Sequence, residues 1–166
     1  TKFDKIIEIG SQPISSRTYR SKIKLKKYPL DLYKCKHCKL IQLSRVAPAK
    51  DMYGSGYGYW TGLSPLMVNH MKKKVKKLNI SKQLKNFSRV LDIGSSDPTF
   101  LNLLKKSKNN LDLFAIDPSA AKFKKSFTQK KINLIVDYFS KEKIDYYLKL
   151  KNISLKKFSL ITSFAM

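Results

Sequence analysis

The stretch RVLDIGSSDPTFL, residues 89–101, decides the fold that this sequence predicts. It reads as a buried strand that runs into a glycine turn and continues into a helix, with Pro98 suited to the first helical turn. The runs LDLFAID, INLIV and FSLITSF then read as further strands, separated by the helical stretches SAAKFKKSF and SKEKIDYYLKL. Strands that alternate with helices indicate βαβ units and therefore an α/β fold with a parallel sheet.

Three zones differ in composition along the chain. Residues 1–46 contain the short alternating runs LDLYKC and KLIQLS, which predict two strands meeting at a CKHC turn. Residues 47–65 are rich in glycine and aromatic residues without a helical period, so they predict a linker. The pattern of residues 66–166 indicates the α/β region. Its first predicted helix has an apolar stripe formed by Met67, Met71, Val75 and Leu78.

Length and cysteine content restrict the setting of the protein. The chain has 166 residues, begins without Met and ends on an apolar run, so we expect a fragment of a longer protein. Its apolar runs are too short to cross a bilayer. Two cysteines, both in the CKHC turn, give no disulfide framework of the secreted kind. These features predict a cytoplasmic protein without a membrane-spanning segment.

The net charge of +24 raises the question of nucleic-acid binding. Nearly all of the positive charge is lysine, and the lysines are spread over every predicted element. Arginine, which binds phosphate and guanine by paired hydrogen bonds, is scarce. The pattern favours solvated lysine faces over a dedicated nucleic-acid surface.

Two residues mark the expected ligand site. Ligands of open parallel sheets bind beyond the carboxyl ends of the strands. Gly94 closes the first strand and Asp117 closes the next, where a carboxylate can accept hydrogen bonds from both hydroxyls of an adenosine ribose. Each residue alone fits a plainer role, Gly94 as a tight turn and Asp117, beside Ser119, as a helix cap. Together, on consecutive strand ends, they favour a nucleoside site.

The turn itself discriminates between nucleoside ligands. A dinucleotide fingerprint would have glycines where this chain has Ser96 and Thr99. Asp97 would also place a negative charge beside a pyrophosphate. A carboxylate there suits a ligand that carries an amine, as the methionine end of S-adenosylmethionine does.

These motifs resemble a known family. VLDIGSSDPTFL, FAIDPS and VDYFS are similar to the cofactor half of class I S-adenosylmethionine-dependent methyltransferases. More narrowly, PLDLYKCKHCKLIQL and MYGSGYGYWTGLSPLMVNH resemble the zinc module and the tyrosine-rich linker of the C-methyltransferases of nucleotide-linked 4-keto-deoxysugars. The linker match includes Ser64 and His70 at the start of a helix. The family usually has Asn-Asp-Gly where this chain has Ser96, Asp97 and Pro98.

The resemblance implies a Rossmann-like parallel sheet, here an incomplete methyltransferase domain, preceded by a partial zinc-ribbon-like β module. It implies S-adenosylmethionine and zinc as cofactors and a nucleotide-sugar as the substrate partner. The second CxxC pair is expected upstream of Thr1, and the general base is expected beyond residue 166. His37 is expected at the surface, and Asp92 is expected to be structural. The implied cofactor-binding residues are Gly94, Ser96, Asp97, Asp117 and Asp137, the zinc ligands are Cys35 and Cys38, and the candidates for catalysis or substrate contact are Tyr57, Tyr59 and His70.

Alternatives remain open from the sequence. The two tyrosines also fit a packing role in the linker, and His70 fits an ordinary position on a helix face. A dinucleotide-dependent oxidoreductase would share Asp117 at the strand end. A basic zinc-ribbon module would bind nucleic acid with a steep dependence on salt. A remnant without activity is the third alternative.

Overall fold

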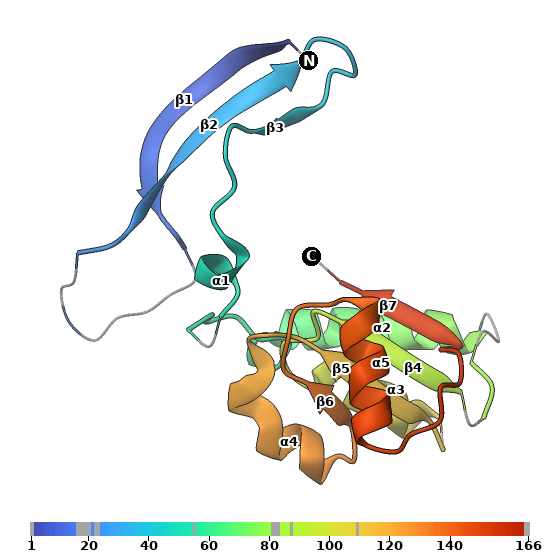
Figure 1. The fold of residues 1–166 in the computed structure, drawn as a ribbon. Helices are drawn as coiled ribbons and strands as arrows, with labels where there is room; N and C mark the ends of the chain where they lie inside the picture. The colour runs from blue at the N-terminus through green and yellow to red at the C-terminus, as the bar shows by residue number, and fades with distance from the viewer. Residues whose placement is uncertain are drawn as a thin grey trace. The chain divides into compact units, whose positions relative to one another are not determined.

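The computed structural model describes residues 2–15, 21, 24–54, 56–80, 84–86, 88–108 and 110–164 (Figure 1). The chain divides into two compact units, Thr1–Gly58 and Tyr59–Met166. The division falls inside the segment 47–65 that the sequence predicts to be a linker. Each unit is described by itself.

The first unit is an antiparallel sheet in the order β1-β2-β3, formed by Phe3–Pro13, Lys27–Cys35 and Ile41–Leu43. The prediction of two strands that meet at the CKHC turn is confirmed, because β2 and β3 pair antiparallel across it. Strand β1 was not predicted. Ten of its eleven residues are exposed, so its sequence lacks the alternation of a strand with one buried face.

The predicted linker also contains two short helices, which corrects the expectation of a segment without helix. Helix α1 spans Ala49–Met52, and the 3₁₀ turn η1 spans Thr61–Leu63. Tertiary contacts hold α1, since Lys26 and Tyr28 both donate hydrogen bonds to the Asp51 carboxylate. Helices this short have no resolvable period in the sequence.

The second unit is α/β. Its four strands, β4 (Arg89–Ile93), β5 (Asp112–Ile116), β6 (Asn133–Ile135) and β7 (Leu160–Ser163), form a parallel sheet in the order β6-β5-β4-β7. The helices are α2 (Pro65–Ile80), α3 (Thr99–Ser107), α4 (Lys124–Gln129) and α5 (Lys141–Leu150), with the 3₁₀ turn η2 (Ala120–Phe123) before α4. This confirms the predicted alternation, and it is compatible with a Rossmann-like fold. A zinc-ribbon module is not shown by the first unit.

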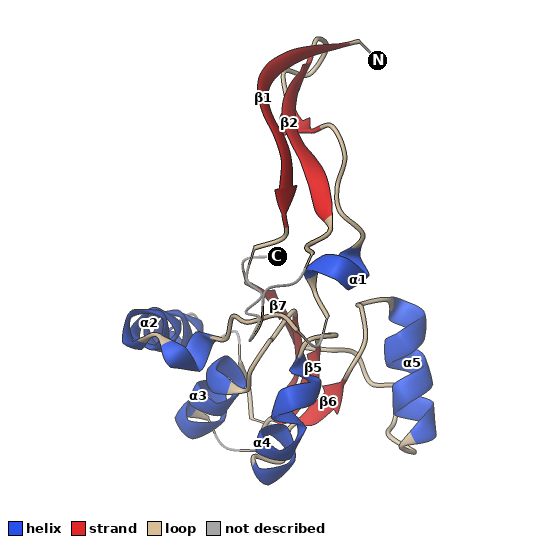
Figure 2. Cartoon of the chain, turned by 90° about the vertical axis from the view of Figure 1, so that its left-hand side faces the viewer, coloured by secondary structure: helices blue, strands red, loops and turns tan. Residues whose placement is uncertain are grey.

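Helices cover both faces of this sheet. Figure 2 shows α2, α3 and α4 on one side and α5 on the other. Correspondingly, the core has two parts: Met71 and Val75 of α2 belong to the cluster that includes Val90, and Ile144 of α5 belongs to the cluster that includes Leu91. Neighbouring residues of β4 thus bury on opposite faces, as the pleat of a strand requires. Among the described residues, no helix is both long and apolar enough to cross a bilayer.

Candidate functional site

The turn between β4 and α3 has an unusual backbone. Gly94 has φ of 69°, in the left-handed region that glycine tolerates best, and its N–H donates to the Ile116 carbonyl 2.9 Å away. Ser96 is also left-handed, with φ of 53°, where a side chain is strained. Pro98 precedes the first residue of α3 and takes the N-cap position. The turn therefore brings residues 94–98 against the end of β5.

Asp117 ties this turn to β5. One carboxylate oxygen, Oδ2, accepts a hydrogen bond from the Ser96 N–H at 2.8 Å. The other, Oδ1, accepts from the N–H and from the hydroxyl of Ser119, both at 2.6 Å. Ser119 takes the N-cap position of η2 without a side-chain cap bond, and Asp117 bonds to Ser119 instead of to an N–H of the helix. The structure also joins two of the predicted cofactor-binding residues, Ser96 and Asp117, through a direct hydrogen bond.

Asp97 makes a second set of bonds on the same turn. Its Oδ1 accepts from the Thr99 N–H at 2.7 Å, at the start of α3. Its Oδ2 accepts from the N–H of Gly62 at 2.9 Å, which lies in η1 far away in the sequence. A carboxylate oxygen has two acceptor positions, so each oxygen retains one for a ligand. On Asp117, Oδ1 already accepts two hydrogen bonds and Oδ2 accepts one, so only Oδ2 retains a position. Together the two carboxylates fit an ammonium group on Asp97 and one hydroxyl on Asp117.

The structure adds two polar groups that the sequence analysis did not assign to the site. Ser95 is buried, and its hydroxyl has no hydrogen-bond partner in the structure. Asp92 on β4 is 2% exposed and accepts a hydrogen bond from the Thr162 hydroxyl at 2.7 Å. Burial raises the pKa of Asp92 to about 7, the Thr162 hydrogen bond opposes this, and the charges of Asp117 and Asp97 add to it. The sequence signal for Asp92 was its place inside an apolar strand.

Asp137 lies in different surroundings. Its carboxylate forms an ion pair with Lys143 and accepts from the N–H of Tyr138. The Lys143 hydrogen bond lowers the pKa of Asp137. These bonds link Asp137 to the start of α5 rather than to the turn 94–98. Its contact with a cofactor stays a prediction.

The three candidates for catalysis or substrate contact are dispersed. Tyr57 belongs to the first unit and packs edge-on against Tyr53, with ring centres 5.7 Å apart. Tyr59 belongs to the second unit, where its carbonyl accepts a hydrogen bond from the Ser96 hydroxyl at 3.0 Å. His70 is exposed on α2. Tyr59 thus bonds to the turn 94–98 through its backbone.

The CKHC turn holds both predicted zinc ligands. Cys35 is buried at the end of β2, Cys38 is exposed, and both are free thiols. Hydrogen bonds from the backbone N–H groups of Cys38 and His37 lower the pKa of Cys35, which favours the thiolate that binds metal. Within the described part of the chain, no group of three or more potential metal ligands is present. A closed zinc site needs four ligands, and the CKHC turn contains two cysteines that could serve as such.

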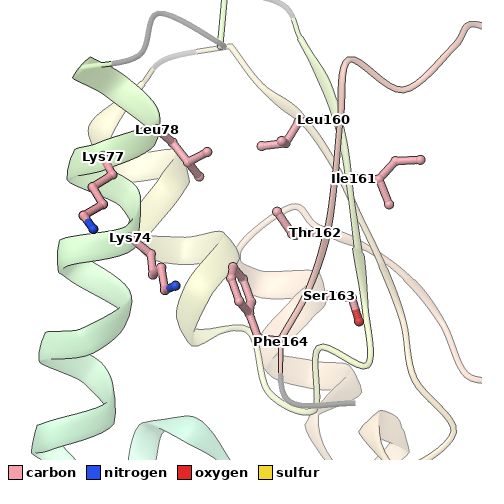
Figure 3. Close-up of a pocket in the computed structure, with 8 residues that line it drawn as sticks. All are labelled: Lys74, Lys77, Leu78, Leu160, Ile161, Thr162, Ser163 and Phe164. Atoms are coloured by element: carbon pink, nitrogen blue, oxygen red, sulfur yellow. The ribbon is translucent and has the colours of Figure 1, made fainter. Parts of the chain in front are cut away.

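A separate groove lies between α2 and β7 (Figure 3). It has a volume of about 470 Å³, and Leu78 of α2 and Leu160 of β7 point toward each other across it. Lys74 and Lys77 line its helix side. None of the predicted site residues lines this groove, so it is distinct from the turn 94–98.

Comparison with protein-family models finds no match for this chain, and comparison with curated proteins finds no relative. The arrangement of its own residues therefore carries the functional argument.

Proposed function

We propose that this chain binds S-adenosylmethionine and serves methyl transfer, with a carbon of a nucleotide-linked keto-deoxysugar as the acceptor. One observation carries the proposal. Asp97 and Asp117 lie just beyond the neighbouring parallel strands β4 and β5, and Ser96, the residue before Asp97, donates its N–H to the Asp117 carboxylate. Two carboxylates held this close suit a ligand that offers an ammonium group and a ribose hydroxyl. The family resemblance of the surrounding motifs supports the same ligand.

Each residue of the turn has a role in this proposal. Asp117 accepts from one ribose hydroxyl at the remaining acceptor position of Oδ2, and Asp97 accepts from the ammonium group of the methionine part. Gly94, without a side chain, allows the ligand to approach the backbone. The buried Ser95 hydroxyl gains the partner that it lacks. When bound, S-adenosylmethionine would supply a methyl group on a good leaving group, so the protein mainly aligns the reactants.

The same turn argues against a dinucleotide. The pyrophosphate of a dinucleotide needs free backbone N–H groups at the start of a helix. Here the Thr99 N–H already donates to Asp97, and Pro98 has no N–H. The Asp97 carboxylate would also repel the pyrophosphate. An oxidoreductase with a nicotinamide dinucleotide is therefore the weaker alternative.

We also propose that Cys35 and Cys38 provide two thiolate ligands to zinc. The lowered pKa of Cys35 supports this, because metal binding requires deprotonated sulfur. Free thiols also agree with the reducing cytoplasm that we propose as the location. The zinc would hold the end of β2 to the turn that follows it.

The test is calorimetric titration of S-adenosylhomocysteine into the chain, with NAD titrated in parallel. Selective binding of S-adenosylhomocysteine is the expected result. The variant Asp117→Ala removes the proposed ribose contact, and Asp145→Asn is the control, since it changes a partly exposed carboxylate on α5. Preference for NAD would contradict the proposal in favour of the oxidoreductase. Binding to DNA or RNA that falls steeply with salt, without binding of S-adenosylhomocysteine or NAD, would favour the nucleic-acid module.

A further inference from the structure

The carboxylates of the proposed site are covered by the chain itself. Asp97 is 4% exposed, and Ser96 and Asp117 are each 7% exposed. A ligand whose ammonium group and ribose hydroxyl bond these carboxylates has to reach their oxygens. Burial of this degree leaves little accessible surface for that contact, and a segment that moved away from these residues would enlarge it.

Residues 59–63, which we call the strap, make direct hydrogen bonds to two of these buried residues. The Ser96 hydroxyl donates to the Tyr59 carbonyl at 3.0 Å. The Gly62 N–H donates to Oδ2 of Asp97 at 2.9 Å. The strap therefore occupies one donor, the Ser96 hydroxyl, and one acceptor, Oδ2 of Asp97, in the turn that the ligand would contact.

The strap is weakly held elsewhere. Its own backbone bonds are long, 3.4 Å from the Leu63 N–H to the Trp60 carbonyl and 3.3 Å from the Ser64 N–H to the Thr61 carbonyl. The Leu63 side chain is largely exposed. A segment with few buried contacts and poor backbone bonds opens at a small fraction of the free energy of global unfolding.

Two contacts of the Trp60 ring add to these hydrogen bonds. The Trp60 ring packs edge-on against Phe123, with ring centres 5.4 Å apart. The Lys122 ammonium lies 5.2 Å from the centre of the Trp60 ring, within the range of a cation–π contact. Phe123 belongs to η2, which follows the Asp117 end of β5. The strap thus spans from the β4 turn to the segment after β5, above both strand ends.

The ends of the strap can act as hinges. On its carboxyl side, Ser64 is fixed to α2, because its hydroxyl accepts from the Met67 N–H at 3.3 Å and its carbonyl accepts from the Val68 N–H at 2.9 Å. On its amino side the sequence has Gly54, Gly56 and Gly58, three residues with wide backbone freedom. A fixed end and a glycine-rich end suit a segment that swings as a unit.

We propose that the strap is a gate for the site: it opens to admit S-adenosylmethionine and to release S-adenosylhomocysteine, and its closed form covers Asp97 and Ser96. This inference rests on the proposed function. The gate sets the rates of ligand entry and exit.

A disulfide across the strap tests the gate. A Cβ placed on Gly62 lies 3.0 Å from Oγ1 of Thr99, which is close enough for a bond between cysteine sulfurs at the two positions. Gly62 is not among the residues with positive φ, so its backbone accepts a cysteine. The double variant Gly62→Cys with Thr99→Cys, oxidised, locks the strap shut, and reduction releases it. Each single variant is the matched control, and peptide mapping by mass spectrometry verifies the bond against pairing with Cys35 or Cys38.

The readout is the rate of S-adenosylhomocysteine binding, followed by tryptophan fluorescence. Trp60 is the single tryptophan of the sequence, so the emission reports on the strap directly. We expect the oxidised double variant to bind at least tenfold more slowly than its reduced form, with recovery upon reduction. Equal rates in the two forms would overturn the gate.

Hydrogen exchange separates failure of the gate from failure of the proposed function. If neither wild type nor reduced variant binds S-adenosylhomocysteine, the proposed function is wrong. The gate is then judged from the Gly62 amide in the ligand-free wild type. Exchange at least tenfold faster than that of the β4 and β5 amides supports a strap that opens locally. Exchange at the same rate as those amides would overturn it.

Discussion

Replacement of Asp92 by Asn should abolish a large part of the pH dependence of stability. Asp92 is 2% exposed, and its pKa rises from an ordinary value of 3.8 to about 7. The unfolded chain therefore releases this proton near pH 4, whereas the folded chain retains it until about pH 7. Between these values the folded state binds more protons, so its stability falls as the pH rises. Above pH 7 this contribution is constant.

The magnitude follows from the same two pKa values. At about 1.4 kcal/mol per pH unit, ionisation of Asp92 lowers the free energy of unfolding by up to about 4 kcal/mol between pH 4 and pH 8. A domain of ordinary stability has about 5–15 kcal/mol in total, so the effect is large. In Asp92→Asn the amide oxygen still accepts from the Thr162 hydroxyl, and no proton is exchanged. The free energy of unfolding of the variant should therefore rise progressively relative to that of the wild type from pH 4 to pH 8.

The assay is urea denaturation at a series of pH values, followed by circular dichroism and by Trp60 fluorescence. Asp145→Asn serves as the control, because it removes a partly exposed carboxylate whose partner is Lys141. Thr162→Val deletes the hydrogen bond that lowers the pKa of Asp92, so this pKa should rise further. The stability of that variant should therefore continue to fall up to a higher pH than the stability of the wild type does. Parallel stability curves for wild type and Asp92→Asn across the whole pH range would refute the reasoning.

Three further predictions concern the site and the CKHC turn. Asp117→Ala should weaken S-adenosylhomocysteine binding by about 1–3 kcal/mol in calorimetry, the usual cost of unpaired polar groups, and unchanged affinity would remove Asp117 from the site. Gly94→Ala should lower the free energy of unfolding by about 1–2 kcal/mol, because φ of 69° is strained for any side chain; thermal denaturation measures it, and wild-type stability would disprove the strain. Cys35→Ser should reduce the zinc that elemental analysis finds in the purified protein, and equal zinc in wild type and variant would exclude Cys35 as a ligand.

The sequence predicted the second unit well because its signals are local. Apolar runs of strand length alternate with helical stripes from residue 66 onward, and each depends on residues that are neighbours along the chain. Strand β1 escaped prediction because its side chains are mostly exposed and impose no alternation. The single helix expected for SAAKFKKSF is divided into η2 and α4 at Phe123 and Lys124. A 3₁₀ turn and an α-helix differ in their backbone hydrogen bonds, and this difference leaves little trace in the types of residue that each contains.

For the site, the sequence by itself determined which residues end the strands. Gly94 and Asp117 had to lie at one edge, because the carboxyl ends of neighbouring parallel strands meet there. Only the tertiary structure decided what their neighbours do. In the folded chain the Ser96 N–H donates to Asp117 and the Gly62 N–H donates to Asp97. Asp137 forms its ion pair with Lys143 of α5. These contacts join residues through three-dimensional packing, and burial, which sets the pKa of Asp92, arises only when the whole sheet and its helices have assembled.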